Sequence, residues 1–135
     1  MNTMKKLSVL SLIVIFIITA SFTLIQNKPW AVPADKAKAV NTVKTSAASI
    51  SEGKALWSTH CASCHGKTGL GDGAKATTLN TAPPDFSKAA FQGQTDGSIF
   101  YKTVEGRGDM PSFKKKITDA DDIWNLVNFM RSLKK

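Results

Sequence analysis

The sequence contains few of the residues that bind metals or cross-link chains. Its 135 residues include two cysteines and two histidines, and all four lie between His60 and His65. A structural zinc site needs four ligands, normally from two separated stretches, so these neighbouring residues exclude one. A thioredoxin-like dithiol is disfavoured because no βαβ pattern surrounds the cysteines. A disulfide between two cysteines so close in sequence would be strained.

Other absences remove further classes of protein. No cysteine lies near position 20, which excludes a lipoprotein anchor. No basic stretch is interleaved with aromatic residues, so we expect no nucleic acid as a partner. The sequence shows no acid–base pair for catalysis, and we therefore expect neither an enzyme nor a small-molecule substrate. No segment alternates between apolar and polar residues as a strand does.

The first 26 residues predict a membrane segment that exports the rest of the chain. Lys5 and Lys6 precede nineteen uncharged residues, which end at Ile25. This length is close to the ~20 residues that span a bilayer and exceeds a usual signal-peptide core. We expect an uncleaved anchor, with the lysines on the cytoplasmic side and the domain facing the periplasm or the cell exterior. The alternative is a cleaved signal peptide and a soluble periplasmic protein, although Ile18 makes cleavage after Ala20 a poor match.

Residues 27–49 are mostly Ala, Lys, Thr, Val, Ser and Pro, without an apolar period. This composition predicts a flexible tether; an irregular extension packed on the domain is the alternative. The folded domain is expected over residues 50–135. A domain of this size buries only about 60% of its unfolded surface, so a bound apolar cofactor would enlarge its core.

The domain is predicted to be all-α, with about three to five short helices. Ser49 and Glu52 have the spacing of a capping box at the start of the first helix. Residues 96–105 predict a short helix that Gly106 ends. The last helix, opened by residues 118–121, carries apolar residues at helical spacing: Ile123, Leu126, Val127, Met130 and Leu133.

Residues 61–65 are Cys-Ala-Ser-Cys-His, the pattern by which a chain attaches a haem covalently. With two intervening residues, one turn of backbone can present the sulfurs of Cys61 and Cys64 to the same porphyrin edge, where each bonds one vinyl group. His65 follows directly and can ligate the iron. The motif therefore predicts one haem c, held by two thioether bonds.

The second axial ligand is expected to be a methionine. His60 lies directly before the haem motif, and its short connection keeps it from the opposite haem face. Two of the four methionines precede the N-terminal apolar run, and Met130 lies on the apolar stripe of the last helix. Met110 lies in a loop, residues 108–111, and a loop can lay a thioether over an iron face. Met110 is therefore the predicted ligand.

Further short motifs follow the haem motif, at residues 69–73, 83–86, 105–113 and 123–133. Together with residues 61–65 they resemble a class I cytochrome c of the small bacterial type. The resemblance covers residues 50–135 and implies a few α-helices around one haem that carries single electrons. It also implies that the first and last helices cross, with Gly53 and Trp57 meeting Leu126 and Phe129.

Further residues are candidates for contacts with the haem and its ligands, and the resemblance implies the first of them. A proline carbonyl is expected to accept the N–H of the His65 imidazole, and Pro83 is the candidate, with Pro84 as the alternative. The family pattern also supports Met110 as a ligand. Arg107 is a candidate partner for a haem propionate, with a surface role as the alternative. Apolar surroundings for the haem are expected from Trp57, Leu79, Phe86, Phe113 and Trp124.

These observations predict a single-electron carrier in an exported respiratory chain, exchanging electrons with redox partner proteins such as a membrane respiratory complex. A haem subunit of a larger membrane oxidoreductase is the first alternative. An open-site haem enzyme or sensor is the second, and it requires that Met110 does not bind. Residues 50–135 carry 12 Lys and Arg against 9 Asp and Glu. Their densest cluster, Lys114–Lys116, is a candidate docking patch for an acidic partner, or else a solvated loop.

Overall fold

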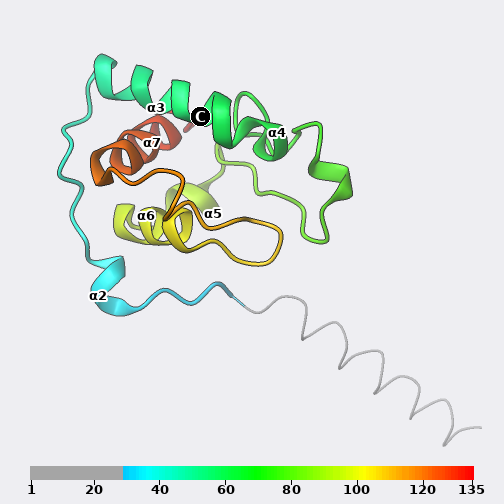
Figure 1. Ribbon diagram of the computed structural model, residues 1–135, viewed down its shortest axis with the longest axis horizontal. Coiled ribbons are helices and arrows are strands. Elements are labelled where there is room, and N and C mark those ends of the chain that lie inside the picture. Colours follow the sequence, from blue (N-terminus) through cyan, green and yellow to red (C-terminus); the bar gives the residue numbers. More distant parts are fainter. Residues whose placement is uncertain (1–28) are drawn as a thin grey trace, which may run out of the picture. The chain divides into compact units, whose positions relative to one another are not determined.

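Six α-helices and one 3-10 turn follow one another along residues 29–135, the part of the chain that the computed structural model describes (Figure 1). Within this range the one β-type pairing is an isolated antiparallel bridge. The all-α prediction is confirmed. The elements are α2 (Ala34–Ala37), α3 (Ala47–His60), α4 (Ala62–His65), η1 (Ala76–Thr78), α5 (Ala89–Gln92), α6 (Asp96–Glu105) and α7 (Ala120–Ser132).

The predicted membrane segment, residues 1–26, lies outside the described residues. From residue 29 onward, no helix has both the length and the apolar character needed to cross a bilayer. Residues 32–135 form one unit with a shared core.

α3 begins three residues earlier than the sequence predicted. Ser46 is its N-cap: the Ser46 Oγ accepts the Ser49 N–H at 3.1 Å, and the Ser49 Oγ accepts the Ser46 N–H at 3.0 Å. The prediction that Ser49 and Glu52 form the capping box is therefore wrong. Ser46 satisfies the first-turn donors one turn earlier, so that Ser49 becomes the third residue of the helix. Glu52 instead accepts a hydrogen bond from Asn125 of α7 at 2.7 Å.

α3 and α7 cross at Gly53, in the upper part of Figure 1. A Cβ atom on Gly53 would lie 2.0 Å from the carbonyl oxygen of Asn125 and 2.9 Å from the Cβ of Phe129. One turn later, the ring of Trp57 lies 5.5 Å from that of Phe129. The predicted crossing of the first and last helices is confirmed, and the absence of a side chain at position 53 permits it.

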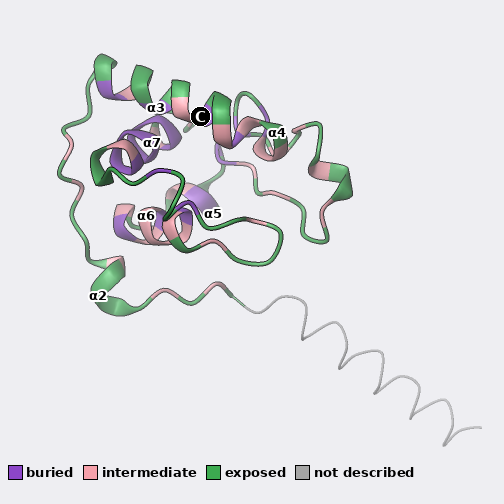
Figure 2. Cartoon of the chain, viewed as in Figure 1, coloured by how far each residue is buried: buried purple, intermediate pink, exposed green. Residues whose placement is uncertain are grey.

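α7 is buried around most of its circumference, as Figure 2 shows, and every residue from 123 to 130 is buried. A helix covered on all sides needs partners for its polar side chains. Asn128, which is 2% exposed, donates to the Val43 carbonyl at 3.1 Å and to the Ser49 Oγ at 3.2 Å. Its Oδ1 accepts from Asn41 Nδ2 at 2.9 Å and from Thr45 Oγ1 at 3.1 Å.

Residues 34–45, here called the N-terminal strap, pack on the domain. The Thr95 hydroxyl donates to the Ala37 carbonyl at 2.6 Å. A Cβ on Gly97 would lie 2.3 Å from the Lys36 carbonyl oxygen, so α2 rests directly on α6. For these residues the predicted flexible tether is wrong, and the packed extension is what the structure shows. The hydrogen bonds come from polar side chains and backbone groups, and the apolar Val43 packs against the core, so the sequence of the strap shows no apolar period.

The core gathers side chains from α3, α5, α6, α7 and the loops between them. Four of the five residues expected to form apolar surroundings for the haem belong to this core. The fifth, Leu79, is only partly buried and lies outside it. The core residues are Trp57, Cys61, Phe86, Phe91, Ile99, Phe113, Ile117, Ile123, Trp124, Leu126, Val127, Phe129 and Met130.

Candidate functional site

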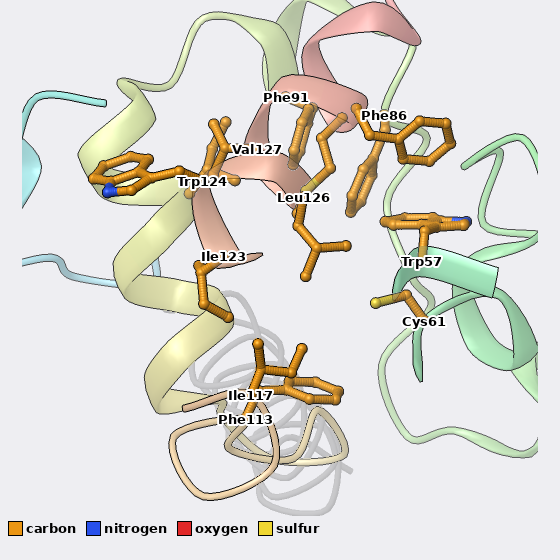
Figure 3. Close-up of a cluster of buried hydrophobic side chains, with 13 residues drawn as sticks. Trp57, Cys61, Phe86, Phe91, Phe113, Ile117, Ile123, Trp124, Leu126 and Val127 are labelled. Carbon is orange, nitrogen blue, oxygen red and sulfur yellow. The ribbon is translucent and has the colours of Figure 1, made fainter. Parts of the chain in front are cut away.

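Cys61 lies between α3 and α4, and Cys64 lies within α4. Neither forms a disulfide. Cys61 is 8% exposed, and in Figure 3 its sulfur points toward apolar side chains that include Leu126. Burial, with a smaller contribution from the Cys64 sulfur, raises the pKa of the Cys61 thiol to about 12. A redox dithiol needs an accessible thiol with a lowered pKa, so the position of Cys61 argues against one.

The loop after α4 folds back and satisfies the carbonyl groups that end this helix. The Gly71 N–H donates to the His65 carbonyl at 3.0 Å, and the Gly73 N–H to that of Cys64 at 3.2 Å. Gly71 has a φ of +78°, which a residue with a side chain adopts only under strain. These bonds hold the backbone of Cys64 and His65 in one arrangement.

The imidazole of His65 lies among aromatic rings. Its ring centroid is 5.6 Å from that of Trp57 and 5.0 Å from that of Phe86. The Trp57 Nε1–H donates to the Gly66 carbonyl at 2.9 Å and so ties the end of α4 to α3. Burial lowers the pKa of His65, so the imidazole is neutral at pH 7. The neutral form is the one that ligates metals.

The His65 Nδ1 atom is buried and has no hydrogen-bond partner among the described residues. The Pro83 carbonyl lies against Gly71, whose N–H donates to the His65 carbonyl: a Cβ on Gly71 would be 2.4 Å from the Pro83 carbonyl oxygen. No hydrogen bond joins Nδ1 to the carbonyl of Pro83 or Pro84. The choice between these two acceptors stays a prediction.

Met110 lies at the end of a tight turn that follows α6. Gly106 starts the turn with a φ of +68°. The Arg107 N–H then donates to the Met110 carbonyl at 2.9 Å, and the Met110 N–H to the Arg107 carbonyl at 3.1 Å. The Met110 side chain is partly buried against the hydrophobic core, of which Cys61 is a member. Met130, by contrast, is 4% exposed within α7 and fills the core, as predicted.

Two other sequence candidates lie at the edge of this region. Arg107 is exposed in the turn that carries Met110, and its pairing with a haem propionate stays a prediction. The ring of His60 lies 6.0 Å from that of Phe113, edge to face.

Asp109 makes a contact that sequence reasoning missed. Its carboxylate accepts the Asn80 N–H at 2.7 Å, the Asn80 Nδ2 at 2.9 Å and the Thr81 N–H at 3.2 Å. These hydrogen bonds, that of the Asn80 side chain foremost, lower the pKa of Asp109. The partners are polar loop residues up to 29 positions away, and no local pattern signals such a pair.

These donors fit a covalently attached haem. Two unpaired thiols stand three positions apart, and a histidine with a buried, unpartnered nitrogen follows them. A thioether, that of Met110, packs against the same core. Thiols for two thioether bonds, an imidazole and a soft sulfur are the groups that c-type haem uses.

Comparison with protein families agrees with this chemistry. The family model described as "Cytochrome C oxidase, cbb3-type, subunit III" matches residues 48–130, more than half of the chain. The chain belongs to this family. Its resemblance to a class I cytochrome c is thereby confirmed, and a cytochrome c domain implies a covalently bound haem c and electron transfer.

Two solved structures resemble this cytochrome c domain. The first, titled "Kuenenia stuttgartiensis reducing HAO-like protein complex Kustc0457/Kustc0458", has 24% sequence identity and a TM-score of 0.65, over 82% of this chain and 54% of that one. The chain thus spans about half the length of that relative, and the likeness shows the fold. The second, "KustC0563 c-type cytochrome", has 30% identity and a TM-score of 0.53, over 62% of this chain and 98% of that one. The comparison with curated proteins found no match.

Proposed function

We propose that this cytochrome c domain is a single-electron carrier. It holds one haem c through Cys61 and Cys64, with His65 and Met110 as the axial ligands of the iron. The observation that carries the proposal is that Cys61 and Met110 meet the same hydrophobic core: Cys61 belongs to it, and Met110 packs against it. Pro83 and Arg107 are the proposed partners of the imidazole N–H and of a haem propionate.

The bound haem supplies an iron that gains and loses one electron, with a potential that a thioether ligand raises. The residues of the chain keep the imidazole available and hold it in place. Burial keeps His65 neutral, so its nitrogen is available at pH 7. The rings of Trp57 and Phe86 flank the imidazole and limit its orientations. The Trp57 indole holds the Gly66 carbonyl and with it the backbone that follows His65.

Optical spectra and a potentiometric titration of the purified holoprotein test this proposal. We expect a low-spin spectrum, the charge-transfer band of a ferric iron–thioether bond, and a titration curve for one electron. A protein that lacks the band and binds carbon monoxide or cyanide readily would instead be an open-site haem enzyme or sensor.

The proposed partner is an acidic redox protein, such as a membrane respiratory complex, that docks on Lys114–Lys116. All three lysines are exposed. Lys114 Nζ lies 3.6 Å from the Glu105 carboxylate, and Lys116 Nζ lies 5.7 Å from the centroid of the Phe113 ring. The cluster thus lies four to six residues after Met110, with Lys114 beside the last residue of α6.

Changing Lys114, Lys115 and Lys116 to glutamate is expected to slow association with the partner about tenfold at low salt, because the charges steer the encounter. The dependence of the rate on salt should also become weaker. Stopped-flow reduction at several ionic strengths measures both effects. A matched control changes three exposed lysines elsewhere, Lys38, Lys54 and Lys134, by the same total charge. Equal effects in the two triple variants would mean that net charge acts rather than a docking patch.

The proposed location is outside the cytoplasm, with the domain anchored by residues 1–26 or, after cleavage of that segment, soluble in the periplasm. The support is the nineteen-residue uncharged run that follows two lysines. Cell fractionation combined with N-terminal sequencing of the mature protein separates the two forms. A mature chain that starts after residue 20 and occurs in the soluble fraction would remove the anchor from the proposal.

A second candidate function is that of a fixed haem subunit in a larger oxidoreductase. It is favoured by the first solved structure, whose title names a protein complex and whose chain is almost twice as long as the part that this chain covers. Affinity purification from the native membrane distinguishes the two. A stoichiometric larger chain that stays bound in high salt supports the subunit, and a monomeric protein supports the mobile carrier.

A further inference from the structure

A carboxylate joins two loops that both carry residues proposed to contact the haem or its ligands. Asp109 is the immediate neighbour of Met110, and its carboxylate accepts three hydrogen bonds from Asn80 and Thr81. The Asn80 loop, residues 79–84, includes Pro83 and Pro84, the candidate partners of the His65 imidazole. Asp109 thus connects the segment that carries one proposed axial ligand to the segment that carries the proposed hydrogen-bond acceptor of the other.

The Met110 loop is held at two places, where it returns to α6 and at its tip. Where the loop returns, the Ser112 Oγ donates to the Val104 carbonyl at 2.7 Å, and the Phe113 N–H donates to it at 3.1 Å. These bonds attach the return to α6. At the tip, the Asp109 carboxylate anchors the chain to the neighbouring loop, one residue before the thioether.

We propose that Asp109 is a positioning residue that latches the Met110 loop onto residues 79–84 and thereby slows the replacement of the Met110 thioether by external ligands. The inference rests on the proposed ligation of the iron by Met110. For the thioether to leave the iron, its loop must move away from the core. With the latch in place, that movement also breaks hydrogen bonds to a charged acceptor, which are stronger than neutral ones.

The rate at which imidazole displaces Met110 from the ferric holoprotein tests the latch. At saturating imidazole this rate approaches the rate of thioether dissociation, and the loss of the iron–thioether charge-transfer band reports it. We expect the rate to rise about fivefold to tenfold in Asp109→Ala, which removes all three bonds. Asn80→Ala removes only the side-chain bond and should give a smaller rise. Asp109→Asn keeps one acceptor oxygen and should lie between the two.

Asp119→Ala is the matched control. Asp119 is also an exposed aspartate, and it accepts the Asp121 N–H at 2.9 Å as the N-cap of α7. Its loss should lower the thermal stability of the protein and leave the imidazole rate unchanged. Amide hydrogen exchange at Asn80 and Thr81 gives a second measurement, and it should accelerate in Asp109→Ala but not in Asp119→Ala.

The outcomes separate the latch from the ligation. Faster displacement in Asp109→Ala than in Asp119→Ala, with faster exchange at residues 80 and 81, supports the latch. A wild-type protein that shows the thioether band, with equal displacement rates in the two variants, overturns the latch and leaves Met110 as the ligand. A wild-type protein without the band overturns the ligation and the latch together.

Discussion

If Met110 is the second axial ligand, as proposed, Met110→Ala is expected to leave the haem iron with an open position. The charge-transfer band of the ferric iron–thioether bond should disappear, and cyanide and carbon monoxide should bind readily. Because the thioether favours ferrous iron, its loss should lower the midpoint potential by on the order of 100 mV or more, within the ~0.8 V that axial ligands span. Absorption spectra and potentiometry of the purified variant measure these changes.

Met130→Leu is the control for this experiment. Met130 is buried in α7, and leucine has a similar volume, so the change should cost less than about 1.5 kcal/mol and leave the band and the potential in place. If Met110→Ala retained the spectrum and the potential of the wild type, another group would be the second ligand. The proposal of His/Met ligation would then be withdrawn.

Gly53→Ala should be among the most destabilising single-methyl additions in this protein. The new Cβ would lie 2.0 Å from the carbonyl oxygen of Asn125 and 2.6 Å from its carbonyl carbon, and both are backbone atoms of a buried helix. Relief requires α3 and α7 to move apart, which also loosens the contact between Trp57 and Phe129. We expect a loss of about 3 kcal/mol or more, at or above the top of the usual range for added core methylenes.

Thermal and denaturant unfolding of the holoprotein, followed by circular dichroism, measures this loss. For a domain of about 100 residues, 3 kcal/mol corresponds to a fall in Tm of roughly 12–24 °C. Lys54→Ala, at the exposed next position of α3, is the control and should change stability by no more than about 0.5 kcal/mol. A Gly53→Ala protein that unfolds within about 1 kcal/mol of the wild type would mean that the two helices do not meet as closely as described.

The features that the sequence predicted well are local. Residues 61–65 define the haem motif because two thiols and an imidazole need only one turn of backbone to meet one ligand. The C-terminal end of α6 was predicted correctly because a glycine, Gly106, follows the last residue of the helix and ends it. The apolar spacing in α7 identified four of its buried residues, Ile123, Leu126, Val127 and Met130, whereas Leu133 is only partly buried, and the polar residues Asn125 and Asn128 are buried as well.

The features that the sequence did not predict depend on polar contacts between distant segments. The N-terminal strap is held by hydrogen bonds from Asn128 and Thr95, which no apolar period announces. Asp109 accepts hydrogen bonds from another loop, and only the structure shows that the two loops lie close together. The start of α3 was misplaced because serine is a common N-cap residue at either position, and the structure shows Ser46 as the N-cap with the Ser49 side chain bonded back to it.

Mass spectrometry of the intact holoprotein under denaturing conditions tests the central claim most directly. If Cys61 and Cys64 form thioether bonds, the chain should carry the added mass of one haem after unfolding, and changing both cysteines to alanine should remove it. A wild-type chain that gives the mass of the polypeptide alone would contradict the account, because a haem bound without covalent bonds is released when the protein unfolds.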